Sequence, residues 1–303
     1  MATAAVCAIM SAQGSNAGDA ANNKANVIPA AVFSEDVGDA ERIESAEYLR
    51  IYTQEVAAAA CFLYNDIDKD TSLLLLTESL DGFEIHLDAL FYGDEKLGIK
   101  GAEERRKTIA QLEELRAAWE PIASAGNTLL SDNTNSEAIG VVKARNMEAY
   151  ELTERLVTTI EGQYANPAVL VQADVIVLEL VGRQATMTQK IAKNACKIFS
   201  GNASPEIKEL LQNSMNIYEV SLTALIEGMP GVGVYAAPTP EIAEALKKVR
   251  ADWQKMRPHL DDLLNGKEMA RDLQIELFRH MADEMHDLEK IAHKYVEYSK
   301  HEH

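Results

Sequence analysis

Five polar residues are packed into eight positions of a segment in the second half of the chain that has apolar residues at helical spacing. The segment covers residues 177–199 and reads VLELVGRQATMTQKIAKNACKIF. The five polar residues are Arg183, Gln184, Thr188, Gln189 and Lys190. A guanidinium among small polar side chains offers a planar fork of donors that suits nitrate, carboxylate or phosphate. All but Lys190 are taken as candidate ligand-binding residues, and the alternative is that the two cations are solvated or paired with carboxylates.

A weaker copy of this segment lies near the start of the chain, over residues 43–64 (IESAEYLRIYTQEVAAAACFLY). On a helix, Arg50 shares one face with the small side chains of Thr53 and Ala57. The equivalent stripe of the second segment is also small, so the two helices could approach closely and leave space at the guanidinium. Arg50, Thr53 and Gln54 are therefore further candidates for binding a small anion. The alternative is that Arg50 pairs with an Asp or Glu on a neighbouring helix.

The two segments belong to an internal repeat. Like residues recur 135 positions apart in the pairs Thr53 and Thr188, Gln54 and Gln189, Phe83 and Tyr218, Gly93 and Gly228, and Gly98 and Gly233. One residue is lost after the glycine loop, so the spacing becomes 134 in the pairs Arg116 and Arg250, Trp119 and Trp253, and Arg145 and Arg279. Matches at one register with one deletion indicate two copies of a four-helix unit.

Apolar residues at three- and four-residue steps predict four helices in each copy. The first copy is expected to form helices over residues 41–66, 68–92, 102–130 and 131–164. The second is expected to form helices over residues 168–200, 204–228, 240–265 and 267–300. No stretch alternates with period two for long enough to indicate a sheet. The predicted fold class is all-α, with two tandem up-down four-helix bundles formed by the internal repeat.

Local signals refine these helices. Pro121 is expected to kink or divide the third helix, and Asp68 or Asp70 to cap the second. Ser204 followed by Pro205 is a helix-start signal. The predicted domains are an export-signal remnant with a flexible linker over residues 1–40, a first repeat over residues 41–166 and a second over residues 167–303.

The amino-acid composition and net charge favour a helical fold and argue against some classes of partner. The chain has 303 residues, 47% of them hydrophobic and only 6% aromatic, which suits close-packed helices better than sheets. A net charge of −19 argues against a nucleic-acid partner and against docking on an anionic membrane surface. No apolar run is long enough to span a membrane. The small, apolar residues 1–10 and the following Ser15-Asn16-Ala17 resemble the back half of a secretory signal, so a periplasmic or secreted location is expected.

The remaining candidates are weaker. Cys61 and Cys196 fall on apolar helix positions and are expected to be buried free thiols, with a disulfide as the alternative. Three histidines of the last expected helix, His280, His286 and His293, lie near carboxylates, but a di-iron site needs such a motif on two helices. Trp119 and Trp253 are expected in the core. No catalytic set, metal centre or cofactor is predicted.

The segment VGRQATMTQKIA resembles the first-helix signature of PilJ-type sensor domains, the N-terminal domains of type IV pili methyl-accepting chemotaxis transducers. The matching residues are Gly182, Arg183, Gln184, Thr188, Gln189, Lys190 and Ala192. The first repeat resembles the signature less closely, at Ala46, Arg50, Ile51, Thr53, Gln54 and Ala57. The resemblance extends over residues 41–302 if both copies are PilJ-like domains in tandem.

The resemblance implies a periplasmic, all-helical sensing module without enzymatic activity. Related nitrate/nitrite sensor kinases (NarX-like) bind a small anion at an arginine of this motif, between two symmetry-related helices. That arginine corresponds to Arg50, whereas the second repeat has Ala185 there, so the resemblance implies one anion site and not two. The implied partners are a small anionic ligand and a membrane transducer or another periplasmic protein. A homodimer and a purely structural helical bundle remain open alternatives.

Overall fold

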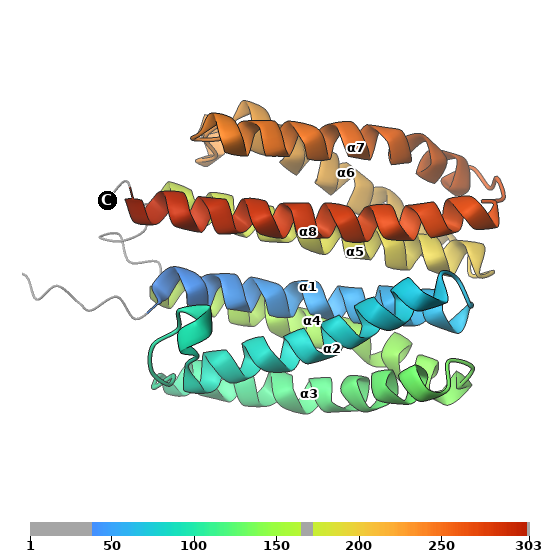
Figure 1. The fold of residues 1–303 in the computed structure, drawn as a ribbon, viewed down its shortest axis with the longest axis horizontal. Coiled ribbons are helices and arrows are strands. Elements are labelled where there is room, and N and C mark those ends of the chain that lie inside the picture. Colours follow the sequence, from blue (N-terminus) through green and yellow to red (C-terminus); the bar gives the residue numbers. More distant parts are fainter. Residues whose placement is uncertain (1–37, 165–171, 302–303) are drawn as a thin grey trace, which may run out of the picture. The chain divides into compact units, whose positions relative to one another are not determined.

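The computed structural model describes residues 38–164 and 172–301 (Figure 1). Eight α-helices fill these two ranges, and the all-α prediction is confirmed. In chain order they are α1 (Asp39–Tyr64), α2 (Lys69–Tyr92), α3 (Arg106–Ser131), α4 (Ser136–Tyr164), α5 (Gln172–Phe199), α6 (Pro205–Glu227), α7 (Pro240–Leu264) and α8 (Arg271–His301). Two short 3-10 helices, η1 (Glu95–Leu97) and η2 (Pro230–Val232), complete the regular structure of the described residues, which contain no strand.

The helices form two four-helix sets. In the first set α1 packs on α2 and α4, and α3 contacts both α2 and α4. In the second set α5 packs on α6 and α8, and α7 contacts both of those helices. Consecutive helices run up and down (Figure 1). The sets meet mainly where α1 packs on α5, and both belong to one compact unit that begins at Asp36, so the predicted boundary between residues 166 and 167 stays a prediction.

The backbone repeats with the predicted period. An isolated bridge joins Asp94 to Ile99 beside η1, and another joins Met229 to Val234 beside η2, 135 positions later. The glycines of these turns also correspond, since Gly93 and Gly228 have φ of 80° and 81°. Such positive φ values favour glycine, because a Cβ would be strained there. The two loops are therefore copies of one structure.

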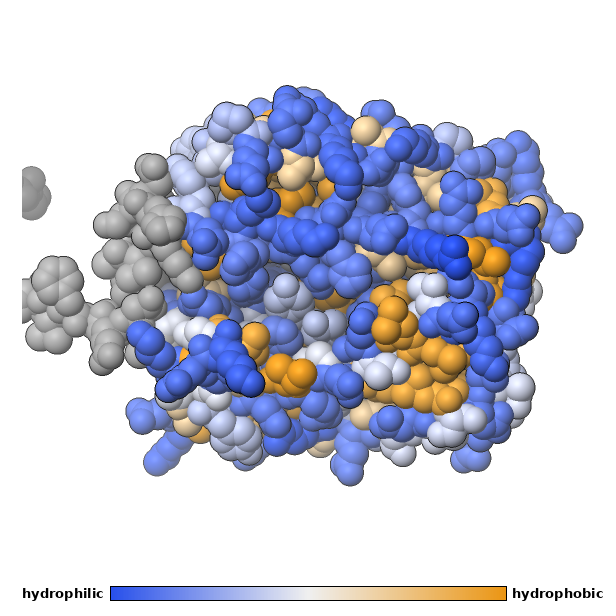
Figure 2. Space-filling view, in the orientation of Figure 1, coloured by the Kyte–Doolittle hydropathy of each residue, from blue (hydrophilic) through white to orange (hydrophobic). Residues whose placement is uncertain are grey.

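Each bundle core holds one aromatic pair at equivalent positions. Trp119 stacks on Phe83 with ring centroids 3.7 Å apart, and Trp253 lies beside Tyr218 at 4.8 Å. Both tryptophans are buried. Large aromatic side chains contribute most to core packing, and the prediction that this pair belongs to the core is confirmed. Outside the core, hydrophilic side chains cover most of the face in Figure 2.

One sequence-based boundary is wrong, and the structure decides between the two alternatives for Pro121 only in part. Pro121 lies inside α3 and does not divide it, so the alternative of a kink stays a prediction. A proline inside a helix costs roughly 3 kcal/mol, and the burial of its neighbours Trp119 and Ile122 offsets that cost. The fourth helix begins at Ser136 and not at residue 131 or 132, because Asp132 accepts hydrogen bonds from Thr134 in a separate turn.

The N-terminal ends of α6 and α2 are formed differently. Ser204 caps α6 as predicted, since its hydroxyl accepts a hydrogen bond from the Ile207 N–H at 3.3 Å. Asp68 is the N-cap residue of α2, one of the two positions predicted, but its side chain makes no cap hydrogen bond. Its carboxylate instead accepts two hydrogen bonds from Arg279 of α8, at 2.6 and 2.9 Å. A bidentate guanidinium pair is stronger than a neutral cap bond, and it joins the two bundles.

A disulfide joins Cys61 of α1 to Cys196 of α5. The expectation of two free buried thiols is therefore wrong. The cysteines are 135 residues apart, which is the repeat period, so they occupy equivalent positions in the two copies. The disulfide therefore links corresponding positions of the two first helices.

The predicted export signal and linker lie outside the described residues up to residue 37, but α1 already begins at Asp39, before the predicted end of the linker at residue 40. Cys7 and the end of the chain after His301 also lie outside the described residues. Within the described residues, no helix combines the length and apolar character that crossing a membrane requires.

Candidate functional site

The packed faces of α1 and α5 contain most of the polar motif residues. The Thr53 hydroxyl donates to the Arg50 carbonyl at 2.8 Å, and the equivalent Thr188 hydroxyl donates to the Ala185 carbonyl at the same distance. The Gln54 amide in turn donates to the Thr53 hydroxyl at 3.4 Å, and Gln189 to Thr188 at 3.3 Å. Hydroxyls that bond their own helix in this way need no ligand to satisfy them.

Two glutamines of the motif reach neighbouring helices of the second bundle. The Gln184 amide donates to the Tyr218 carbonyl of α6 at 3.1 Å. The Gln189 amide donates to the Met281 carbonyl of α8 at 3.3 Å. Both side chains are buried, so these bonds hold α5 in register within its own bundle.

Arg50 is buried at the contact between the two repeats and is only 1% exposed. Its guanidinium donates to the carboxylate of Glu47, one turn earlier on α1. It also donates to Glu154 of α4 at 3.2 Å and lies 3.8 Å from the Glu179 carboxylate of α5. The alternative in which Arg50 pairs with acidic residues of neighbouring helices is therefore what the structure shows.

Arg183 lies at the solvent-accessible side of the same contact. Its guanidinium donates to the Glu179 carboxylate, through Nε at 3.0 Å and also through Nη2, and lies 3.8 Å from Glu154. Arg183 is 36% exposed, whereas Arg50 is almost fully buried. The two arginines predicted from the sequence are thus brought together by two shared carboxylates.

Further charged groups surround these pairs. The Tyr150 hydroxyl donates to Glu154 at 2.6 Å, and the Lys190 ammonium lies 3.6 Å from the centroid of the Tyr150 ring. The charge cluster is defined here by four carboxylates and three cations from α1, α4 and α5. Its members are Glu47, Arg50, Glu154, Glu161, Glu179, Arg183 and Lys190.

Burial moves the pKa values of three members of this cluster toward neutrality. Burial raises the pKa of Glu47 to about 8, although Arg50 acts in the opposite direction. Burial and the neighbouring Glu179 raise the pKa of Glu161 to about 7. Burial also lowers the pKa of Lys190 to about 8. The cluster can therefore gain or lose protons in the physiological range, which is a common property of functional sites.

The guanidinium of Arg50 already has carboxylate partners, with which an anion would have to compete. Burial alone would raise the pKa of Glu154, but Arg50 and the Tyr150 hydroxyl outweigh it and hold that pKa below its usual range. Glu154 is thus an ionised competitor for any anion that approaches Arg50. Its side chain is 28% exposed, and that of Glu179 is 25% exposed, so an anion from solvent would meet these two carboxylates first.

Lys193 is a buried charged residue that sequence reasoning missed. Its ammonium donates to the Gln54 amide oxygen and, at 2.9 Å, to the Asn146 amide oxygen. Burial holds the pKa of Lys193 well below its usual range, and Lys197 and Lys190 add to that shift. The spacing contained a signal, because Lys193 follows Gln189 by one helical turn and therefore falls on the same buried stripe.

The histidines of α8 form carboxylate pairs and not a metal centre. His280 Nε2 lies 3.1 Å from Glu284, and His286 Nδ1 lies 3.0 Å from Glu289. Within residues 38–164 and 172–301, no group of three or more potential metal ligands comes together.

We predict that Glu47→Gln changes how stability depends on pH. The pKa of Glu47 is about 8 in the folded protein and about 4.5 in an unfolded chain, so only the folded state keeps this proton between those values. The wild type should therefore lose about 1.4 kcal/mol per pH unit relative to Glu47→Gln as pH rises through this window. Urea unfolding of both proteins at several pH values between 5 and 8 measures this difference.

The prediction compares the stabilities of wild type and Glu47→Gln because Lys193 changes the stability of both proteins with pH in the opposite direction. Its lowered pKa makes the stability of the wild type rise with pH above the folded pKa. The Lys193 contribution cancels in the difference, since both proteins contain it. Parallel stability curves for wild type and variant would contradict the raised pKa of Glu47.

Residues 172–277 match the family model described as PilJ, type IV pili methyl-accepting chemotaxis transducer N-term. The match covers α5, α6 and α7 with the beginning of α8, so this part of the second repeat is similar to PilJ-type domains. It does not include the first repeat, and two tandem PilJ copies stay a prediction. No curated protein matches the chain.

Proposed function

We propose that the chain is a non-enzymatic sensory domain in which ligand binding changes how the first repeat packs on the second across α1 and α5. The PilJ-type match supports a sensory role. In this proposal the domain is exported, works in the periplasm and passes its conformational change to a membrane transducer or another periplasmic protein.

The charge cluster is the observation that carries this proposal. A buried ion pair contributes little net stability, because desolvation offsets the Coulomb attraction. A packed interface made of such pairs is therefore easily biased between two arrangements by one added or removed charge. Here Arg50 of α1 is held by Glu154 of α4 and Glu179 of α5, so a change at one pair affects contacts between both repeats.

The proposed ligand is a small anion. It would replace Glu154 or Glu179 at the two guanidiniums, entering from the side where Arg183 is exposed. Thr53, Gln54, Gln184, Thr188 and Gln189 would then act by holding the helices and not by touching the ligand, because each already makes a hydrogen bond within the protein. Displacement of an ionised carboxylate predicts weak, salt-sensitive binding.

Thermal unfolding with nitrate, nitrite, sulfate, phosphate and acetate tests this proposal. A ligand at one hundred times its dissociation constant stabilises a protein by about 2.7 kcal/mol. We expect at least one anion to raise the melting temperature at constant ionic strength, and Arg183→Gln to remove that shift. Arg145→Gln is the matched control, because Arg145 makes only an exposed pair with Glu148 on α4.

The competing function is a structural or interaction module without a small-molecule ligand. This function is supported by the bonds that the motif residues already make within the protein. The hydroxyls of Thr53 and Thr188 donate to carbonyls of their own helices, and Arg50 has carboxylate partners. If no anion changes the melting temperature, or if Arg183→Gln leaves a shift intact, anion sensing at the cluster is wrong and the structural function is favoured.

A further inference from the structure

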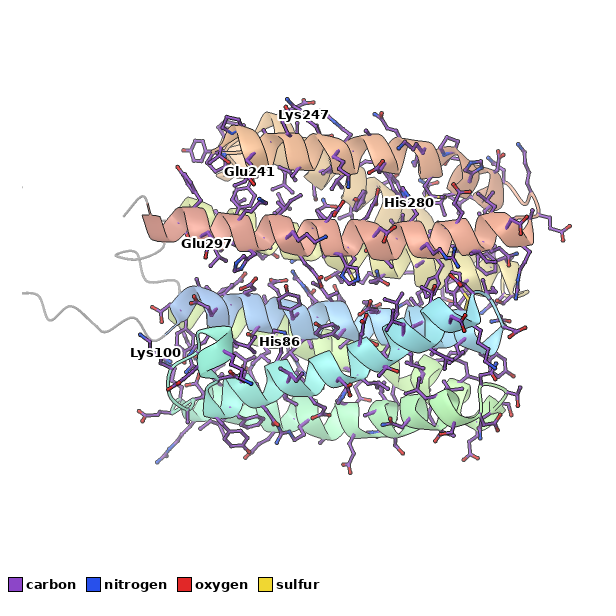
Figure 3. The ribbon with its side chains drawn as sticks, in the orientation of Figure 1. His86, Lys100, Glu241, Lys247, His280 and Glu297 are labelled. Carbon is purple, nitrogen blue, oxygen red and sulfur yellow. A yellow bond between two sulfur atoms is a disulfide. The ribbon has the colours of Figure 1, made fainter. Side chains whose placement is uncertain are left out.

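A groove of about 520 Å³ lies between α1, α2, η1 and α8. This volume falls in the usual range of small-molecule sites. Tyr48 and Tyr52 of α1 line it, two residues to either side of Arg50 in sequence, so they leave the helix on the side away from the charge cluster. His86 of α2 lines it too and is labelled beside α1 in Figure 3.

Three aromatic rings form one wall of the groove. The Tyr48 ring stacks with the His86 ring at 4.5 Å between centroids, and Tyr52 lies 5.9 Å from both. His86 Nδ1 is 3.1 Å from the Ser45 hydroxyl, which fixes the imidazole. Gly82 of α2 leaves room for the Tyr52 ring, because a Cβ at this position would overlap it. The rings are thus held in place before any ligand binds.

The charge of the groove is negative. Its described lining includes the carboxylates of Glu41, Glu44, Glu95 and Glu289, against the ammonium of Lys96 and the imidazole of His293. Burial lowers the pKa of His86 to about 4, so this imidazole is neutral at physiological pH. Burial and then Glu289 raise the pKa values of both tyrosines above their usual range, as expected beside negative charge.

A small apolar void adjoins the groove, and the two share Glu44, Tyr48 and Glu289. The void has a volume of about 20 Å³ and is lined on the α5 side by Gly182 and Ala185. These residues are the repeat equivalents of Glu47 and Arg50, so the second copy lacks the side chains that fill the first.

Glu47 connects the void to the charge cluster. Its side chain lines the void and is 5% exposed as a residue, and its Oε1 is buried without a hydrogen-bond partner. A buried acceptor without a partner is costly, and native structures rarely retain one without a reason. The groove and the void are therefore lined by aromatic rings, apolar side chains and more carboxylates than cationic groups, although His286 pairs with Glu289 and His293 lies 3.9 Å from Glu44.

The aromatic wall is specific to the first repeat. The positions equivalent to Tyr48, Tyr52 and His86 are Arg183, Met187 and Ser221. Because the second repeat forms the same four-helix bundle without these rings, the fold does not require them.

We propose that this groove binds a small organic ammonium ion. Aromatic faces attract such cations through the ring quadrupole, and the surrounding carboxylates attract them by charge. The ammonium head would lie by Tyr48 and Glu289, with its alkyl part toward the apolar void. This site is separate from Arg50 and stands whether or not the charge cluster takes an anion.

Choline and its uncharged isostere 3,3-dimethyl-1-butanol test the proposal by titration calorimetry and thermal unfolding of the full chain. We expect choline to bind and to raise the melting temperature, and the isostere to do neither. Tyr48→Leu and Glu289→Gln should each weaken choline binding by about tenfold, the scale of a desolvated cation–π contact. Tyr48→Phe keeps the ring and should leave the affinity within about twofold.

Glu276→Gln is the matched control, because Glu276 is an exposed carboxylate of α8 that does not line the groove. Circular dichroism of each variant distinguishes loss of binding from loss of fold. If Tyr48→Leu does not fold, the affinity of Glu289→Gln for choline decides the test. The proposal is overturned if choline does not bind, if the isostere binds equally well, or if Glu289→Gln binds choline as the wild type does. Arg183→Gln should leave choline binding unchanged, which separates this site from the proposed anion response.

Discussion

Loss of the Cys61–Cys196 disulfide is expected to lower the melting temperature by about 10–20 °C, the largest effect that a covalent change in this protein should have. The bond closes a loop with a sequence separation of 135. For a loop of this length the chain-entropy relation gives about 5 kcal/mol of stabilisation. In a protein of this size each kcal/mol corresponds to about 2–4 °C.

The position of the disulfide adds to this expectation. It joins α1 to α5 at equivalent positions of the two repeats, so without it the repeats are held together by noncovalent contacts and the charge cluster. The double variant Cys61→Ser with Cys196→Ser should therefore unfold at lower temperature than the wild type, and a reducing agent should have the same effect on the wild type alone.

Cys7→Ser is the control for this experiment, because it removes a thiol and leaves the Cys61–Cys196 bond intact. It should melt like the wild type and keep its sensitivity to reduction. Peptide mapping without reduction should recover Cys61 and Cys196 in one linked fragment. A melting temperature that reduction does not change would contradict the entropic stabilisation.

The helices and turns of each repeat could be predicted because their sequence signals are local. Helical periodicity depends on residues three and four positions apart, and the turn glycines Gly93 and Gly228 depend on a backbone conformation that favours glycine. The disulfide was predictable by the same reasoning. Cys61 and Cys196 are separated by the repeat period, and equivalent residues of two first helices can meet on a two-fold axis.

The partners of Arg50 could not be predicted in this way. Glu154 and Glu179 lie 104 and 129 residues away, on helices whose rotation is set by the packing of both bundles. The motif indicated that a guanidinium would be surrounded by small side chains, but not which carboxylates would reach it. In a chain with 48 acidic residues, many partners were compatible with the pattern.

Arg50→Ala is expected to destabilise the protein by about 3–5 kcal/mol, because removing one partner of a buried ion pair leaves the remaining charges without compensation. Glu154 and Glu179 would lose the buried guanidinium and keep only the partly exposed Arg183 as an arginine partner. Urea unfolding at pH 7.5 measures the loss. Arg145→Ala is the matched control, since its exposed pair with Glu148 should contribute no more than about 0.5 kcal/mol.

The pH dependence of this loss tests its electrostatic origin. Arg50 holds the pKa of Glu154 below its usual range, so the arginine stabilises the folded state while this carboxylate is ionised. Stability from a lowered carboxyl pKa is present above the unfolded pKa and is lost as pH falls through the folded pKa. The Arg50→Ala penalty should therefore shrink when the pH is lowered toward 4, whereas a penalty that stays constant would show that lost packing and not charge explains it.

Combining Arg50→Ala with Glu47→Gln then separates the pairs of Arg50. At pH 7 most Glu47 side chains carry a proton because burial raises their pKa to about 8, and glutamine resembles that protonated form. Glu47→Gln alone should therefore stabilise the protein at pH 7 by about 3 kcal/mol, because the unfolded variant no longer gains free energy from ionising this side chain, and the two substitutions should be nearly additive. A coupling energy of about 3 kcal/mol would instead mean that Glu47 is the ionised partner of Arg50. Near-additivity would assign the cost of Arg50→Ala to Glu154 and Glu179, the carboxylates that link Arg50 to α4 and α5.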